Sequence, residues 1–182
     1  MTTETIRKRE RLARVLRDVK KNRRKTRSEA EIAVYTAGYQ GLSIDEFLSL
    51  LFEKGIKRII DVRKNSVSRV FGFHKSTLSW LPDRLEIEYT HRPELGVPSE
   101  WRRNLNRPED YEAMLNRYEN EILSVSGNSL REVSEMMIEK PSVLMCREAD
   151  PLYCHRSRLA EIISNISNMG VRDLRASNEE RL

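Results

Sequence analysis

Residues 143–163, VLMCREADPLYCHRSRLAEII, limit the fold of this chain more than any other stretch. The apolar run Val143–Met145 predicts a short buried strand, and residues 156–166 carry apolar side chains with the spacing of one helix face. A strand that leads into a helix is typical of sheets built from βαβ units. The only two cysteines, Cys146 and Cys154, lie at the predicted end of the strand and start of the helix.

Three polar residues, His155, Arg156 and Ser157, follow Cys154 directly. In open α/β sheets, ligands bind where strands end and helices begin, because loop side chains and helix N–H groups meet there. Packing alone does not require Cys-His-Arg-Ser at such a place. The stretch is therefore a candidate functional site.

The rest of the chain repeats the alternation of strands and helices. Ser43 and Glu46 form a capping box at the start of one predicted helix, and Gly55 is placed to end it. This order predicts a three-layer α/β domain over residues 31–182, with a central, mainly parallel sheet flanked by helices. Strands are expected at 32–36, 56–62, 86–90, 143–145 and 171–174, and helices at 44–52, 75–81, 108–123 and 130–138.

A basic arm precedes this domain, over residues 1–30. Residues 1–28 hold twelve Lys or Arg and three Asp or Glu, whereas the remaining 154 residues hold 21 basic and 25 acidic groups. The spacing of Leu12, Val15, Leu16 and Val19 predicts a cationic helix with one apolar stripe. The Arg7–Arg27 arm could bind nucleic acid or another polyanion, or its stripe could dock on protein. A membrane surface is a third reading, which the absence of aromatic residues on the stripe disfavours.

Composition indicates where in the cell the protein is expected to work. No run of about 18 apolar residues is present, so no transmembrane helix is expected, and the first residues do not resemble a signal peptide. Two cysteines do not make a disulfide framework. We expect a cytoplasmic protein with reduced thiols and no membrane partner.

Polar side chains follow each predicted strand. If the strands are parallel, these side chains meet at one edge of the sheet, where several arginines and a helix N-terminus would form an anion-binding cleft. Glu94 could orient a group or act as a base beside a histidine, or it could brace a turn. The expected anion ligands are Arg63, Arg69, Arg156 and Ser157, and the expected groups for proton transfer are His91, Glu94 and His155. Arg63 could instead pair with Asp61 or Glu94.

The cysteines allow several readings. Cys154 could be a nucleophile, because a helix N-terminus, His155 and Arg156 would each lower the pKa of its thiol, and Cys146 reads as a core residue. A phosphatase-type Cys-x5-Arg loop is excluded, because Leu152 and Ala160 occupy the positions where arginine is required. A metal site formed by Cys146, Glu148, Cys154 and His155 is conceivable, but the Cys-x7-Cys-His spacing matches no common zinc pattern, so no metal ligand is assigned. The sequence leaves the cofactor unknown.

Four segments resemble the DUF488 family, a group of small and mostly uncharacterised proteins. They are YTAGYQGLSIDEFLSLL, IIDVRKNSVSRVFGFHKSTL, IEYTHRPELGVP and VLMCREADPLYCHRS, and the resemblance runs from Tyr35 to Ile163. It implies an α/β fold with a largely parallel sheet and carries little functional knowledge. Tyr39 departs from the family pattern, where many relatives have histidine.

The leading hypothesis is a protein that binds or acts on nucleotides or nucleic acid through a phosphate-binding cleft at the strand ends. One alternative is a non-enzymatic DNA-binding, RNA-binding or adaptor module. A second is a thiol enzyme that uses Cys154.

Overall fold

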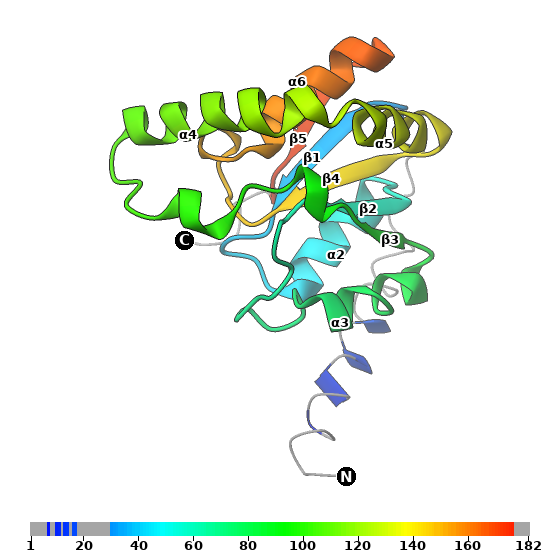
Figure 1. Cartoon of the computed structure of the whole chain (residues 1–182). Helices are drawn as coiled ribbons and strands as arrows, with labels where there is room; N and C mark the ends of the chain where they lie inside the picture. The colour runs from blue at the N-terminus through cyan, green and yellow to red at the C-terminus, as the bar shows by residue number, and fades with distance from the viewer. Residues whose placement is uncertain (1–6, 8–9, 12, 15, 18–29, 177–182) are drawn as a thin grey trace.

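In a computed structural model, residues 30–176 are described, together with residues 7, 10–11, 13–14 and 16–17 of the arm. One sheet has the strand order β3-β2-β4-β1-β5, and all its pairings are parallel (Figure 1). The predicted α/β class is confirmed. The strands are β1 (Val34–Gly38), β2 (Arg58–Asp61), β3 (Glu88–His91), β4 (Ser142–Cys146) and β5 (Val171–Leu174).

Helices cover both faces of the sheet, as Figure 1 shows, with α2 and α3 on one side and α4, α5 and α6 on the other. Each face has its own apolar core, because alternate strand residues point to opposite sides. Val143 and Met145 face the α2 side, whereas Leu144 and Cys146 face the α6 side. The helices are α2 (Ile44–Glu53), α3 (Lys75–Leu78), α4 (Pro108–Glu121), α5 (Gly127–Glu139) and α6 (Arg156–Ser167).

The register of the sheet brings the carboxyl ends of four strands to one edge. Gly38 of β1 pairs with Cys146 of β4, and Asp61 of β2 pairs with Met145 of β4 and His91 of β3. The residues that follow these strands therefore leave the sheet side by side. The expected meeting of the strand ends is confirmed.

Several element boundaries differ from the sequence prediction by up to three residues. The strand expected at 32–36 begins at Val34 and extends to Gly38, because Gly38 lies against the backbone of Glu148 and keeps pairing with β4. The helix expected at 75–81 ends at Leu78, and Pro82 starts a separate 3₁₀ turn. The predicted capping box of Ser43 and Glu46 is present at the start of α2.

The described arm residues are helical and contact the domain. Leu16 packs against the core on the α2 side, and the guanidinium of Arg11 lies 4.4 Å from the centre of the Phe71 ring. These contacts support the alternative that the apolar stripe of the arm docks on protein. Arg7 and Arg17 are exposed to solvent. The rest of the predicted arm helix lies outside the described residues. In the described part of the chain, no helix combines the length and apolar character needed to cross a membrane.

Candidate functional site

Four side chains from the β4–α6 connection converge beneath the sheet edge. The Oε2 atom of Glu148 lies 3.1 Å from the sulfur of Cys146 and 3.2 Å from the sulfur of Cys154. The Nδ1 atom of His155 lies 3.8 Å from the Cys146 sulfur. The two thiols and the imidazole are buried, and the Glu148 side chain is 23% exposed. A carboxylate, an imidazole and two sulfurs thus share one small volume.

Local sequence explains why the connection folds back in this way. Strand β4 is buried along its whole length and ends at Cys146, and the carboxylate of Asp150 then caps a short 3₁₀ turn that starts at Pro151. The 3₁₀ turn delivers Cys154 and the first residues of α6 under the strand end. Arg156 fixes the loop by donating hydrogen bonds to the carbonyls of Glu148 and Ala149.

The imidazole of His155 has a defined tautomer. Its Nε2 atom lies 2.9 Å from the carbonyl oxygen of Val62, which can only accept, so Nε2 carries the proton. Its Nδ1 atom lies 3.2 Å from the Nη2 atom of Arg102, which can only donate. Nδ1 is therefore unprotonated, and its lone pair accepts from Arg102 beside the cysteine cluster. Tyr118 packs edge-on against the ring and helps to fix it.

Arg102 is a site residue that sequence reasoning missed. Its Nη1 atom donates to Oε1 of Glu148 at 2.8 Å, and its Nη2 atom lies 3.9 Å from the sulfur of Cys146. Arg102 ends a 3₁₀ turn, Ser99–Arg102, that is far from β4 in sequence and follows no strand directly. Its position depends on tertiary packing, and no local pattern could have indicated it.

The cluster separates the pKa values of the two thiols. Burial acts to raise the pKa of Cys146, but its interactions with Cys154 and His155 outweigh burial and hold this pKa well below its ordinary value. Burial and the hydrogen bond with Cys146 hold the pKa of Cys154 well above its ordinary value. The sequence predicted a lowered pKa for Cys154, and this direction is wrong.

Burial, followed by the negative charge of Cys146, raises the pKa of the Glu148 carboxyl above its ordinary value. Burial opposes the charge of Arg102, yet the neighbouring Cys146 and Glu148 raise the pKa of its guanidinium. Cys146 and Glu148 thus stabilise the positive charge of Arg102 at the edge of the cluster.

Arg63 is engaged in a buried ion pair at the end of β2. Its Nε and Nη2 atoms donate to the two oxygens of Asp61, at 2.8 and 2.6 Å. Its Nη1 atom donates to the hydroxyl of Tyr39 and to the carbonyl of Phe73, and Tyr89 donates to Asp61 from the other side. Burial opposes the charge of Arg63, and the Asp61 hydrogen bond and charge raise its pKa. The ion pair between Arg63 and Asp61, which was the predicted alternative to anion binding by Arg63, is therefore formed.

The remaining predicted site residues are spread more widely. His91 accompanies the Arg63 loop, with its Nε2 atom 2.9 Å from the Arg63 carbonyl oxygen, whereas Glu94 is exposed and lies 3.6 Å from Arg92. Among the described residues, His91 and Glu94 share no hydrogen bond. Arg69 is exposed on its loop.

Two further predicted residues serve the architecture of the loop. Arg156 is fully buried, and its guanidinium contacts Asp173 as well as the two loop carbonyls. The hydroxyl of Ser157 donates to the Cys154 carbonyl. Their anion-binding roles stay predictions.

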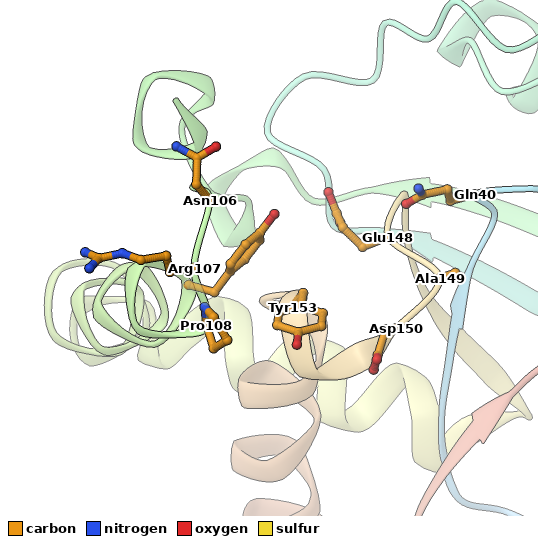
Figure 2. Close-up of a pocket in the computed structure, with 9 residues that line it drawn as sticks. Gln40, Asn106, Arg107, Pro108, Glu148, Ala149, Asp150 and Tyr153 are labelled. Carbon is orange, nitrogen blue, oxygen red and sulfur yellow. The ribbon is translucent and has the colours of Figure 1, made fainter. Parts of the chain in front are cut away.

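Two cavities flank the cluster. A cavity of about 380 Å³ is shown in Figure 2, with Asn106, Arg107 and Pro108 on one side and Glu148 and Tyr153 on the other. The second cavity, of about 290 Å³, lies on the Arg102 side and is called here the basic cavity. Its lining residues are Tyr39, Arg63, Lys64, Asn65, Val67, Val97, Ser99, Arg102 and Arg147.

The geometry supports two kinds of chemistry. The basic cavity can bind an anion, because arginine and lysine side chains line it. The ligand atoms of Cys146, Cys154 and His155 lie within 4.8 Å of one another, which is compatible with one metal ion. Alternatively, the lowered pKa of Cys146 suits thiolate chemistry.

Comparison with known proteins gives one match. The family model described as domain of unknown function DUF488 matches residues 43–163, which is roughly two thirds of the chain and includes the β4–α6 connection. The predicted resemblance is confirmed. No curated protein and no solved structure matches.

Proposed function

This chain belongs to the DUF488 family, whose description names no activity, and we propose from its site that it binds the phosphate group of a nucleotide in the basic cavity. The observation that carries the proposal is that four basic residues, Arg63, Lys64, Arg102 and Arg147, line this cavity. No acidic residue lines this cavity in the described part of the chain. Such a wall favours an anion.

Lys64 and Arg147 are the side chains best suited to contact the ligand directly. Both are exposed, and neither has an ion-pair partner among the residues that the structure describes. Arg63 and Arg102 contribute differently, because each is already paired with a carboxylate. Both still line the cavity, but their carboxylate partners partly neutralise their charge, so they contribute less positive potential than Lys64 and Arg147.

The remaining lining residues suit the group attached to a phosphate. Tyr39, Val67 and Val97 give apolar surface, and Asn65 and Ser99 give neutral hydrogen-bonding groups. A volume of about 290 Å³ holds a phosphate with part of its attached group and lies at the lower end of the range for small-molecule sites. This mixed wall supports a nucleotide over inorganic phosphate alone.

Calorimetric titration with a nucleoside monophosphate and, separately, with inorganic phosphate tests the proposal. Replacing Arg147 by Ala should weaken nucleotide binding about tenfold or more, because a hydrogen bond to a charged group contributes about 1.5–3 kcal/mol. Lys64→Ala should weaken it to a similar extent, and Arg147→Lys should recover part of the affinity. Arg84→Ala, an exposed arginine outside the cavity, is the matched control.

Unchanged nucleotide binding in the Arg147→Ala and Lys64→Ala proteins would overturn the proposal. Equal loss in Arg84→Ala would also do so, because it would show that net charge alone drives binding. Arg69→Ala tests the wider cleft predicted from sequence, in which Arg69 also binds the anion.

Nucleic acid binding by the arm is a second candidate function, favoured by the exposure of Arg7 and Arg17 on a helix that docks through Leu16. Docking through an apolar residue leaves cationic groups facing solvent. A helix held in this way can neutralise backbone phosphates and release their counterions.

A further inference from the structure

We propose that Cys146, Glu148, Cys154 and His155 form a binding site for one zinc ion. The proposal concerns the cluster under the β4–α6 connection and does not depend on anion binding in the basic cavity. Three of these residues bring ligand atoms within 4.8 Å of one another, and Glu148 contacts both sulfurs through a single oxygen. The spacing of the two cysteines in the sequence matches no common zinc pattern. They still come close together, because the 3₁₀ turn between them folds the chain back.

The distances are close to those of a tetrahedral zinc site. With zinc–sulfur bonds of about 2.3 Å and bonds to nitrogen or oxygen of about 2.0–2.1 Å, neighbouring ligand atoms lie roughly 3.3–3.8 Å apart. The carboxylate oxygen of Glu148 lies 3.1 and 3.2 Å from the two sulfurs, and His155 Nδ1 lies 3.8 Å from the Cys146 sulfur. The ligand atoms of Cys146, Cys154 and His155 lie within 4.8 Å of one another, so closing the cluster around one ion requires side-chain movements of up to about 1 Å.

The histidine has the hydrogen bond that metal-binding histidines usually have. A ligating imidazole commonly donates its second N–H to a carbonyl or carboxylate, which fixes the ring and its tautomer. His155 donates from Nε2 to the Val62 carbonyl at 2.9 Å, which leaves Nδ1 unprotonated. Its single lone pair accepts from Nη2 of Arg102 at 3.2 Å, so an ion that binds Nδ1 replaces this hydrogen bond. The ring is 1% exposed and packs against Tyr118, which prevents it from turning away.

Two arginines supply the charges that surround such a site. Zinc with two thiolates, one carboxylate and a neutral imidazole carries a net charge of −1, which Arg102 balances from 2.8 Å through the second oxygen of Glu148. The Nε–H group of Arg156 is buried and has no hydrogen-bond partner among the described residues. Arg156 interacts with Cys154, so a Cys154 thiolate would supply an acceptor for this donor.

The ligand types and the access route favour zinc over harder cations. Two sulfurs and an imidazole suit a borderline-soft ion, whereas magnesium and calcium prefer oxygen ligands. Glu148 lines the cavity of about 380 Å³ (Figure 2) and is the least buried of the four proposed ligands. An ion can enter from this cavity after Glu148 turns aside.

Metal titration of the full-length, reduced protein tests the proposal. Cobalt(II) is the spectroscopic probe, because thiolate ligation produces intense charge-transfer absorption that carboxylate or imidazole ligation does not. We expect this absorption to saturate at one cobalt per chain, and zinc to displace the cobalt with a Kd below about 1 µM, as for structural zinc sites. Absence of thiolate-to-cobalt absorption in a folded, reduced protein would overturn the proposal.

Variants locate the ion. His155→Ala and Cys154→Ser should each weaken zinc binding at least a hundredfold, and the control His74→Ala, an exposed histidine that caps α3, should leave it unchanged. Circular dichroism checks that each variant folds, and the absorption of the wild-type protein decides the question if a variant does not. Zinc binding that persists in His155→Ala, or that is lost in His74→Ala, would place the ion elsewhere. A Cys146–Cys154 disulfide that forms in place of metal binding would also contradict the site.

Discussion

The guanidinium of Arg102 and the carboxylate of Glu148 form an ion pair, with 2.8 Å between Nη1 and Oε1, above two buried thiols. Arg102 lines the basic cavity and Glu148 lines the cavity on the other side, so the pair stands between them. An anion that attracts Arg102 would compete with Glu148 for its donors. The two candidate activities thus share one pair of side chains.

The first prediction concerns the charge of Arg102. Arg102→Met retains much of the length of the side chain but leaves Glu148 without its partner, so zinc affinity should fall about 10–100-fold, as for other residues that hold a ligand in place. Competition against a chromophoric chelator measures the change. Arg103→Met, an exposed neighbour, is the control. Equal affinity in the Arg102→Met protein and the wild type would show that Glu148 does not need this partner.

The second prediction concerns the Asp61–Arg63 pair. Asp61→Asn keeps the size of the side chain but leaves the charge of Arg63 buried without a counterion, so the free energy of unfolding should fall by about 3–5 kcal/mol. Urea denaturation measures this loss. Asp83→Asn, on an exposed turn, should change the stability by less than about 0.5 kcal/mol. A comparable loss in both variants would contradict the special role of the buried pair.

The sequence predicted the framework of the site better than its contacts. Strand endings are visible in sequence because buried apolar runs stop at polar residues, as at Asp61 and Cys146, and parallel strands must align these endings. The sequence does not determine whether Arg63 binds a ligand or pairs with Asp61, because an arginine beside a strand end can do either. Only the packed structure shows that the two carboxylate oxygens of Asp61 accept from Nε and Nη2 of Arg63.

Arg102 and the pKa of Cys154 show where sequence reasoning failed. Arg102 reaches the cysteines from a turn more than forty residues before them, so its approach depends on how α4 and the strands pack. The pKa of Cys154 was expected to fall because positive groups follow it in the chain. Burial and the hydrogen bond with Cys146 act in the opposite direction, and neither can be predicted from neighbouring residues in the chain.

The third prediction concerns Gly38, where β1 meets the site loop. A Cβ atom at this position would lie 1.8 Å from the carbonyl oxygen of Glu148, which is backbone and cannot turn away. Gly38→Ala should therefore lower the free energy of unfolding by about 1–3 kcal/mol and displace Glu148 from the cysteines. Thermal and urea unfolding measure the first effect, and weaker cobalt binding reports the second.

Gly127→Ala is the control for this change. Gly127 begins α5, and a Cβ atom there meets nothing within 4 Å, so the substitution should be neutral or stabilise the protein by up to about 1 kcal/mol. If Gly38→Ala is as harmless as Gly127→Ala, the β1 strand does not approach Glu148 as closely as described.

The fourth prediction concerns pH. Hydrogen bonds from Lys140 and Arg58 lower the pKa of Glu88 below its ordinary value of 4.5, so the folded state favours the ionised carboxylate. The resulting stability is present above pH 4.5 and is lost as the pH falls through the lowered pKa. Glu88→Gln should therefore be less stable than the wild type at pH 7, with a difference that shrinks toward pH 3. Urea denaturation midpoints of both proteins across this pH range test the prediction. A stability difference between them that grows as the pH falls would contradict it.

The fifth prediction concerns the arm and separates binding from docking. Replacing Arg7 and Arg17 by Gln removes two exposed charges and leaves the contacts of Leu16 and Arg11 with the domain intact. If the arm binds nucleic acid, the slope of log affinity against log salt should become shallower by up to about two units, because fewer counterions are released. The same replacement of two exposed arginines on the domain, Arg84 and Arg103, should leave the slope unchanged.

Deleting the whole arm would be less informative, because it would also uncover the apolar surface that Leu16 covers and the ring of Phe71. Lost binding could then result from a perturbed domain, whereas the two Gln substitutions change charge alone. Fluorescence anisotropy with a labelled single-stranded oligonucleotide, repeated at several salt concentrations, provides the slopes. An unchanged slope in the Arg7→Gln/Arg17→Gln protein would assign the arm to docking, because a helix that contacts phosphates cannot lose two exposed charges without releasing fewer counterions.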